Sequence, residues 1–170
     1  MLAEWLKKPV PKNRLWLAVI LGLIAILIYN YLAELITERL GVSLPQKNSR
    51  FNLLDVSTYL ILFYGAICEE ILFRAPLLWA VAKWKKFSWV MASAGGLSFL
   101  FGLAHGWQYG SLFYGTLWFG IGGFGYCLIF LKCGGFQGLG FQAVAVTSLV
   151  HGFYNWTIVL LKLVNGITDM

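Results

Sequence analysis

The chain has 170 residues, of which 59% are apolar and 12% are charged, and its mean hydropathy is +0.74. A soluble domain carries about 25% charged and 45–50% apolar residues, so the composition excludes an ordinary soluble domain and indicates a multi-span membrane protein. The net charge of +6 does not indicate a nucleic-acid partner, because most basic residues lie between apolar segments, where they mark orientation in the bilayer.

Long apolar runs recur along the chain at lengths that suit membrane-spanning helices. The first run follows a basic segment, but it is too long for the apolar region of a signal peptide, and no small-residue cleavage site closes it. Five spans are predicted, with approximate bounds 15–33, 53–82, 87–105, 111–131 and 141–161. The sequence therefore predicts an all-α protein, a polytopic transmembrane helix bundle of about five spans.

The connections between the spans differ in composition. Residues 34–52 mix charges with glycine and proline, which is typical of an amphipathic extension that leads into a loop, and a short turn is predicted at 106–110. The segment Gly120–Gly125 fits the pattern GxGxxG, but it lies inside a predicted span with no preceding strand, so phosphate binding is not indicated. Close helix packing explains these glycines, together with Gly102 and Gly106 in the same spacing class.

Basic residues gather at three places: before the first span, between the second and third, and just after the fourth. These places fall on one side of a five-span bundle, which the positive-inside rule assigns to the cytoplasm. We therefore predict a multi-pass protein of the cell membrane with a cytoplasmic N-terminus. Residues 1–52 are expected to form the basic N-terminus, first span and loop, and residues 53–164 the core.

Three charged residues interrupt the apolar run of the second span from Val56 to Ala82. An ionisable side chain at the bilayer centre costs roughly 2.5–3.5 kcal/mol, so we expect these residues to face the interior of the bundle. Glu70 and Arg74 are four residues apart with the acid on the N-terminal side, an orientation that favours an ion pair. Glu69 is turned about 100° away and has no local partner, so it is the carboxylate available for chemistry.

The two histidines of the chain fall within two further apolar spans. Phe101 lies one turn from His105 on the same helical face, where it could pack the imidazole into a fixed orientation. His151 and Asn155 are also four residues apart, so their side chains project from one face. At 1.5 Å per residue, Glu69, His105 and His151 all lie roughly 20–28 Å from the basic side.

This set of residue types indicates hydrolysis of an acyl bond, in particular a peptide bond. Neither HExxH nor GxSxG occurs, which argues against common zinc-protease and serine-hydrolase arrangements. A carboxylate and a histidine could activate water, while a second histidine and an amide could stabilise an oxyanion. Glu69, His105 and His151 could equally hold a zinc ion that activates the water, so the residues leave the use of a metal open.

Three motifs in this order resemble the signatures of the CAAX-processing and bacteriocin-processing (CPBP, or Abi) intramembrane proteases. They are EExxxR (Glu69, Glu70, Arg74), FxxxH (Phe101, His105) and HxxxN (His151, Asn155). Each motif alone is weak, whereas the ordered set over roughly residues 53–164 is specific.

The resemblance implies an intramembrane endopeptidase that acts on a peptide or membrane-protein substrate. Eukaryotic relatives clip prenylated CAAX proteins, and bacterial relatives are linked to peptide maturation, bacteriocin self-immunity and surface-protein display. The family pattern assigns water activation to Glu69 and His105, the oxyanion site to His151 and Asn155, and support of the motif to Glu70 and Arg74. Family members commonly have more spans, so this chain is close to a minimal version.

Other classes of function remain compatible with the residues. Polar groups in membrane helices can serve only as contacts between helices, each hydrogen bond adding about 0.6 kcal/mol, but ionisable groups at matched depth favour a functional site. A catalytically silent immunity or scaffold protein of the same family is one alternative, which the intact motifs disfavour. A small transporter or proton relay is another, disfavoured by the short length and the lack of an internal repeat. The expected partners are the lipid bilayer and the substrate, and the residues do not fix an oligomeric state.

Overall fold

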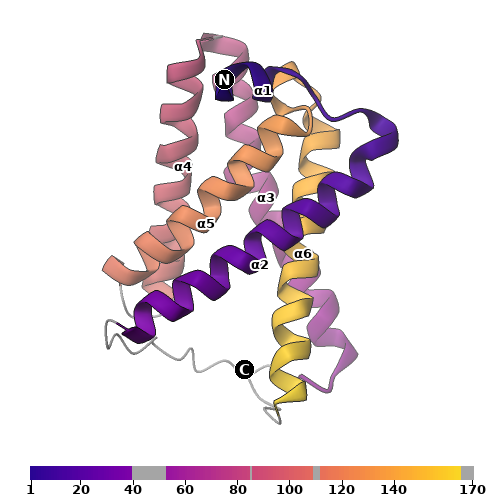
Figure 1. Cartoon of the computed structure of the whole chain (residues 1–170), viewed down its shortest axis with the longest axis vertical. Helices are drawn as coiled ribbons and strands as arrows, with labels where there is room; N and C mark the ends of the chain where they lie inside the picture. Colours follow the sequence, from indigo (N-terminus) through magenta and orange to yellow (C-terminus); the bar gives the residue numbers. More distant parts are fainter. Residues whose placement is uncertain (40–52, 85, 109–111, 166–170) are drawn as a thin grey trace.

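The protein is an all-α bundle, as the sequence predicts. A computed structural model describes residues 1–39, 53–84, 86–108 and 112–165, and this part of the chain is helical without strands. The elements are α1 (Leu2–Lys7), a 3-10 turn (Lys12–Arg14), α2 (Leu15–Arg39), α3 (Val56–Trp84), α4 (Phe87–Gln108), α5 (Leu112–Lys132), a second 3-10 turn (Gly135–Gln137) and α6 (Gly140–Val164) (Figure 1). Helices α2 to α6 are each long and apolar enough to cross a membrane.

The first span is longer than predicted, because α2 continues to Arg39 instead of ending near Ala33. Its polar side chains satisfy themselves locally: the Thr37 hydroxyl donates to the carbonyl groups of Ala33 and Glu34 at 3.1 and 2.9 Å. The predicted amphipathic extension therefore continues the helix, while the rest of the predicted loop, 40–52, lies outside the described residues.

The turn predicted from Gly106 onward is wrong at its start, because α4 extends through Gln108; residues 109–111 lie outside the described part of the chain. The backbone of Gly106 packs against Gly115 of α5, where a Cβ on Gly115 would collide with it. This glycine permits close helix packing instead of a turn, in the way expected for membrane helices.

Helices α4 and α5 approach closely along a row of glycines. A Cβ on Gly102 would lie 2.6 Å from the carbonyl oxygen of Thr116 and 2.8 Å from the amide nitrogen of Gly120, both in the backbone of α5. A Cβ on Gly123 would lie 2.9 Å from the ring of Phe101. The packing explanation for the glycines of the GxGxxG pattern is confirmed, and the closeness of the two helices fixes where α4 presents its side chains.

The remaining helices pack on one side of this pair (Figure 1). Helix α6 packs along α3, and α2 crosses α5 and α6 on the outside of the bundle (Figure 1). At the upper end in Figure 1, α1 lies beside the end of α5, where the Lys132 ammonium donates to the carbonyl groups of Trp5 and Lys8 at 2.7 and 2.6 Å. The end of α3 and the beginning of α4 lie at the same end (Figure 1), so the described residues of the three basic clusters gather there.

Candidate active site

The ion pair predicted within α3 is present. Arg74 Nε lies 3.1 Å from Glu70 Oε2, and both side chains are fully buried. The contact is one of charge, without an aligned hydrogen bond, and no described residue accepts a hydrogen bond from the guanidinium. Instead, the guanidinium carbon lies 5.2 Å from the ring centroid of Phe101 and 5.8 Å from that of Tyr126, where the π faces stabilise the positive charge.

Glu69 faces both histidines. Its Oε2 lies 3.8 Å from His105 Nε2 and 3.7 Å from His151 Nε2, so α3, α4 and α6 each contribute one group. The Glu69 side chain is 37% exposed, against 16% and 8% for the two imidazoles, which puts the carboxylate on the open side of the cluster. Both distances exceed a direct hydrogen bond and suit a bridging water.

His105 is held in one orientation by Phe101. Its Nδ1 lies 2.9 Å from the Phe101 carbonyl oxygen, and because a carbonyl only accepts, Nδ1 must carry the proton. In the neutral imidazole, Nε2 therefore presents its lone pair towards Glu69. The Phe101 ring packs on the imidazole at a centroid distance of 4.2 Å, as predicted, and Phe119 of α5 packs at 4.8 Å.

His151 is oriented by Glu70, the other carboxylate of the pair. His151 Nδ1 lies 3.0 Å from Glu70 Oε1, and the carboxylate that faces Arg74 accepts this hydrogen bond. The Tyr126 ring stacks on the imidazole with a centroid distance of 4.8 Å and an interplanar angle of 28°. These contacts leave Nε2 facing Glu69, so Glu70 links the ion pair to the histidine of α6.

Asn155 makes a different contact from the other predicted site residues. Its amide nitrogen donates to the carbonyl oxygen of Leu62 at 3.4 Å, which lies on α3 seven residues before Glu69. The structure thus brings together the two carboxylates, the arginine and both histidines, whereas the Asn155 amide binds α3 about two turns away.

The cluster of Glu69, His105 and His151 contains residue types that can bind a metal ion. Among the described residues, no three His, Cys, Asp or Glu side chains are arranged to hold a metal ion. Zinc would require ligand atoms converging to about 2.0–2.3 Å from one point, and the cluster of Glu69, His105 and His151 does not have that arrangement.

Two aromatic residues of α5, Phe119 and Tyr126, contact the histidines although sequence reasoning did not single them out. Helix α5 contains many aromatic residues, and none of the three motifs lies on it. No local spacing distinguishes Tyr126 from its neighbours, because its contact with His151 arises from the packing of α5 against α6.

The fold and the cluster define a class of protein: a polytopic membrane protein with carboxylates and histidines gathered among its spans. Residues 52–157 match the family described as Type II CAAX prenyl endopeptidase Rce1-like. The match covers more than half of the chain, and the protein belongs to this family, which confirms the resemblance. Neither the curated proteins nor the solved structures gave a match. The chain is thus a multi-pass member of an intramembrane protease family that acts on protein substrates.

Proposed function

We propose that the protein is an intramembrane endopeptidase that hydrolyses a peptide bond of a membrane-associated substrate, with water activated by Glu69 and His105. The observation that carries the proposal is the position of Glu69 Oε2, 3.8 and 3.7 Å from the Nε2 atoms of His105 and His151. Membership of an endopeptidase family supports it.

The attacking water is held between Glu69 and His105. Since His105 Nδ1 donates to Phe101, Nε2 carries the lone pair that accepts a proton from the water, and the carboxylate accepts the other hydrogen bond of the water. The water oxygen attacks the scissile carbonyl carbon while its proton passes to this pair, which acts as the general base.

His151 stabilises the oxyanion of the tetrahedral intermediate. The His151 Nδ1 atom is bound to Glu70, so an N–H at Nε2 would donate to the developing negative charge, and such preorganised donors contribute strongly in a site shielded from water. The family pattern also assigns Asn155 to the oxyanion, and the donor there would be the amide hydrogen that does not bind the Leu62 carbonyl. When the intermediate collapses, the carbon–nitrogen bond breaks, and the proton held by Glu69 and His105 passes to the leaving amine.

The substrate enters on the open side of the cluster, where Glu69 is exposed. By the family description, a CAAX-type protein is one candidate, and a peptide undergoing maturation is another. The site lies in the cell membrane, with the basic end of the bundle in the cytoplasm.

The test is cleavage by the purified full-length protein in liposomes. The probes are a quenched fluorescent peptide ending in a farnesylated CAAX sequence and the same peptide without the prenyl group, with products identified by mass spectrometry. Glu69→Gln should lower turnover at least 10²-fold, the scale expected when a general base is lost, without changing the melting temperature. Glu4→Gln is the matched control, because Glu4 lies on α1 and pairs with Lys7. Equal turnover in wild type and Glu69→Gln would refute the mechanism.

A further inference from the structure

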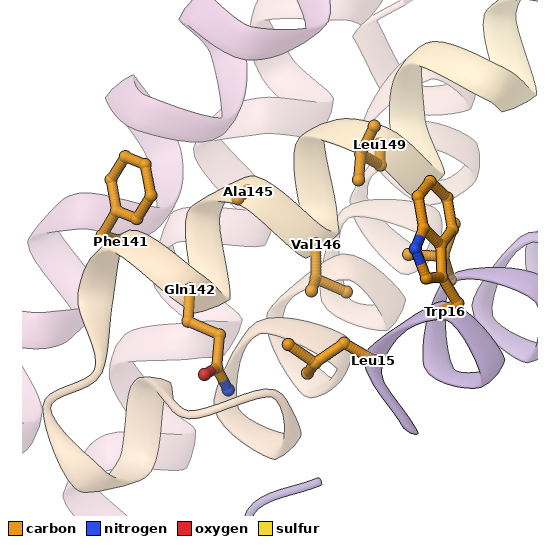
Figure 2. Close-up of a pocket in the computed structure, with 8 residues that line it drawn as sticks. Leu15, Trp16, Phe141, Gln142, Ala145, Val146 and Leu149 are labelled. Atoms are coloured by element: carbon orange, nitrogen blue, oxygen red, sulfur yellow. The ribbon is translucent and has the colours of Figure 1, made fainter. Parts of the chain in front are cut away.

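A groove lies on the outside of the bundle, between the beginning of α2 and the first half of α6. We call it the α2–α6 groove; its volume is about 340 Å³, and its walls are apolar except for Gln142 (Figure 2). Val19 and Val146 form its buried part, while Trp16 and Phe141, which are 66% and 92% exposed, flank it. The groove therefore opens towards the lipid.

The apolar groove continues into a second hollow at the basic end of the bundle. This second hollow, of about 450 Å³, shares Phe141 and Gln142 with the groove and is also lined by Lys12. Glu4, an acidic residue at this end, is engaged 3.0 Å from Lys7, so it does not neutralise Lys12. A positive charge thus lies at one end of the α2–α6 groove.

The dimensions match one leaflet of a bilayer. The groove follows α6 from Phe141 to Leu149, a rise of about 12 Å at 1.5 Å per residue. One leaflet contributes about half of a hydrocarbon core that is roughly 30 Å thick. Trp16 at the start of α2 is placed as rings of the interfacial aromatic belt are, so Lys12 lies at the level of the lipid headgroups.

We propose that the α2–α6 groove is a binding site for an anionic phospholipid, with one acyl chain along the groove and the phosphate beside Lys12. The apolar walls suit the acyl chain, and the ammonium group selects for negative charge, because a lysine near an anionic membrane surface contributes about 1 kcal/mol of attraction. This site is independent of the proposed protease function.

A lipid bound in this groove would stabilise the packing of α2, α5 and α6 beside the candidate active site. Val19 and Val146 belong to the core cluster where α2, α5 and α6 meet, and Tyr126, which stacks on His151, belongs to the same cluster. A ligand that binds only the folded state stabilises it by an amount that rises with the free ligand concentration relative to its Kd. The melting temperature should therefore rise with the concentration of the anionic lipid.

The test titrates detergent-purified protein with dioleoyl phosphatidylglycerol and dioleoyl phosphatidylcholine, with bound lipid counted by native mass spectrometry and stability followed by thermal unfolding. Wild type should prefer phosphatidylglycerol. Lys12→Gln should reduce that affinity about fivefold, the equivalent of one lysine at the surface, and Lys12→Arg should restore it. Ala145→Phe, which fills the groove, should abolish binding of both lipids.

Two variants control for general effects of charge and bulk. Lys86→Gln removes a charge at the same end of the bundle, and Ala25→Phe adds a ring to an exposed position of α2 outside the groove; both should bind lipid as wild type does. Equal affinity for the two lipids, or equal loss in a control, would overturn the proposal. So would glycerol phosphate, which has no acyl chain, if it bound as tightly as phosphatidylglycerol. If Ala145→Phe does not fold, the affinities of the Lys12 and Lys86 variants for phosphatidylglycerol decide whether the proposal holds.

Discussion

The α4–α5 and α3–α6 interfaces hold helices together in opposite ways within one bundle. Between α4 and α5, glycines such as Gly102 bring backbone against backbone. Between α3 and α6, large rings and polar groups meet: Phe63 packs on Trp156 at 5.2 Å, and the Trp156 indole donates to the Tyr59 carbonyl at 2.8 Å. Even Gly152 of α6 receives the ring of Phe63 and not a backbone.

The comparison shows that this bundle uses one interface for close backbone packing and the other for the polar contacts of the candidate site. Lipid tails are as apolar as the side chains they contact, so membrane helices associate through close packing and hydrogen bonds. The α4–α5 interface is held by close packing, which fixes the position of α4 and therefore of His105. The α3–α6 interface is held by polar contacts, and one of them, from Glu70 to His151 at 3.0 Å, also orients the His151 imidazole.

The largest effect should come from Arg74→Met, which breaks the polar interface. The variant leaves the fully buried Glu70 carboxylate without its cation, and such a loss typically costs about 3–5 kcal/mol. Adding Glu70→Gln should recover most of the unfolding free energy, because the uncompensated charge is gone. Cleavage should stay low in the double variant, since His151 faces an amide instead of a carboxylate. Unfolding in detergent and peptide cleavage separate the two effects, and a double variant as unstable as Arg74→Met alone would contradict this prediction.

The next largest effect should come from replacing glycines at the two interfaces with alanine. In Gly102→Ala, the new methyl group meets backbone atoms of α5 at 2.6 and 2.8 Å, which cannot move independently, so overpacking should cost about 1–3 kcal/mol. Gly152→Ala should cost less, because the ring of Phe63 can shift. Gly95→Ala is the matched control on α4, since its Cβ meets nothing within 4 Å, and it should be neutral or stabilise by up to about 1 kcal/mol. A greater loss in Gly152→Ala than in Gly102→Ala, measured by thermal unfolding, would reverse the comparison.

The sequence reveals local features of the fold and the site, because they follow from composition and helical spacing. The five spans follow from apolar runs, and the pairing of Glu70 with Arg74 follows from their four-residue separation. The end of α2 was missed because its polar residues bind their own backbone through Thr37. Helix α1 was missed because six residues are too few for a periodic signal.

The contacts between helices cannot be predicted from the sequence alone. Matched depth along the spans predicts that Glu69 and the histidines lie near one level, but it does not give the rotation of each helix. The hydrogen bond from His151 to Glu70 depends on that rotation, as does the contact of Asn155 with Leu62. For this reason one turn of α6 binds the carboxylate pair while the next binds the backbone of α3.

The smallest effect concerns Tyr126, the residue that joins the two interfaces. It lies on α5, the partner of α4, and its ring stacks on His151 and faces Arg74. Aromatic pairs contribute about 0.5–1.5 kcal/mol beyond burial, so Tyr126→Leu should lower kcat by up to about tenfold with little change in KM. Tyr126→Phe keeps the ring and should retain wild-type kcat, because the Tyr126 hydroxyl has no hydrogen-bond partner among the described residues. Phe130→Leu, one turn along α5 in the separate core cluster beside α1, controls for lost volume. If kcat falls as much in Phe130→Leu as in Tyr126→Leu, α5 only supports the bundle. If kcat falls only in Tyr126→Leu, the Tyr126 ring positions the His151 imidazole directly.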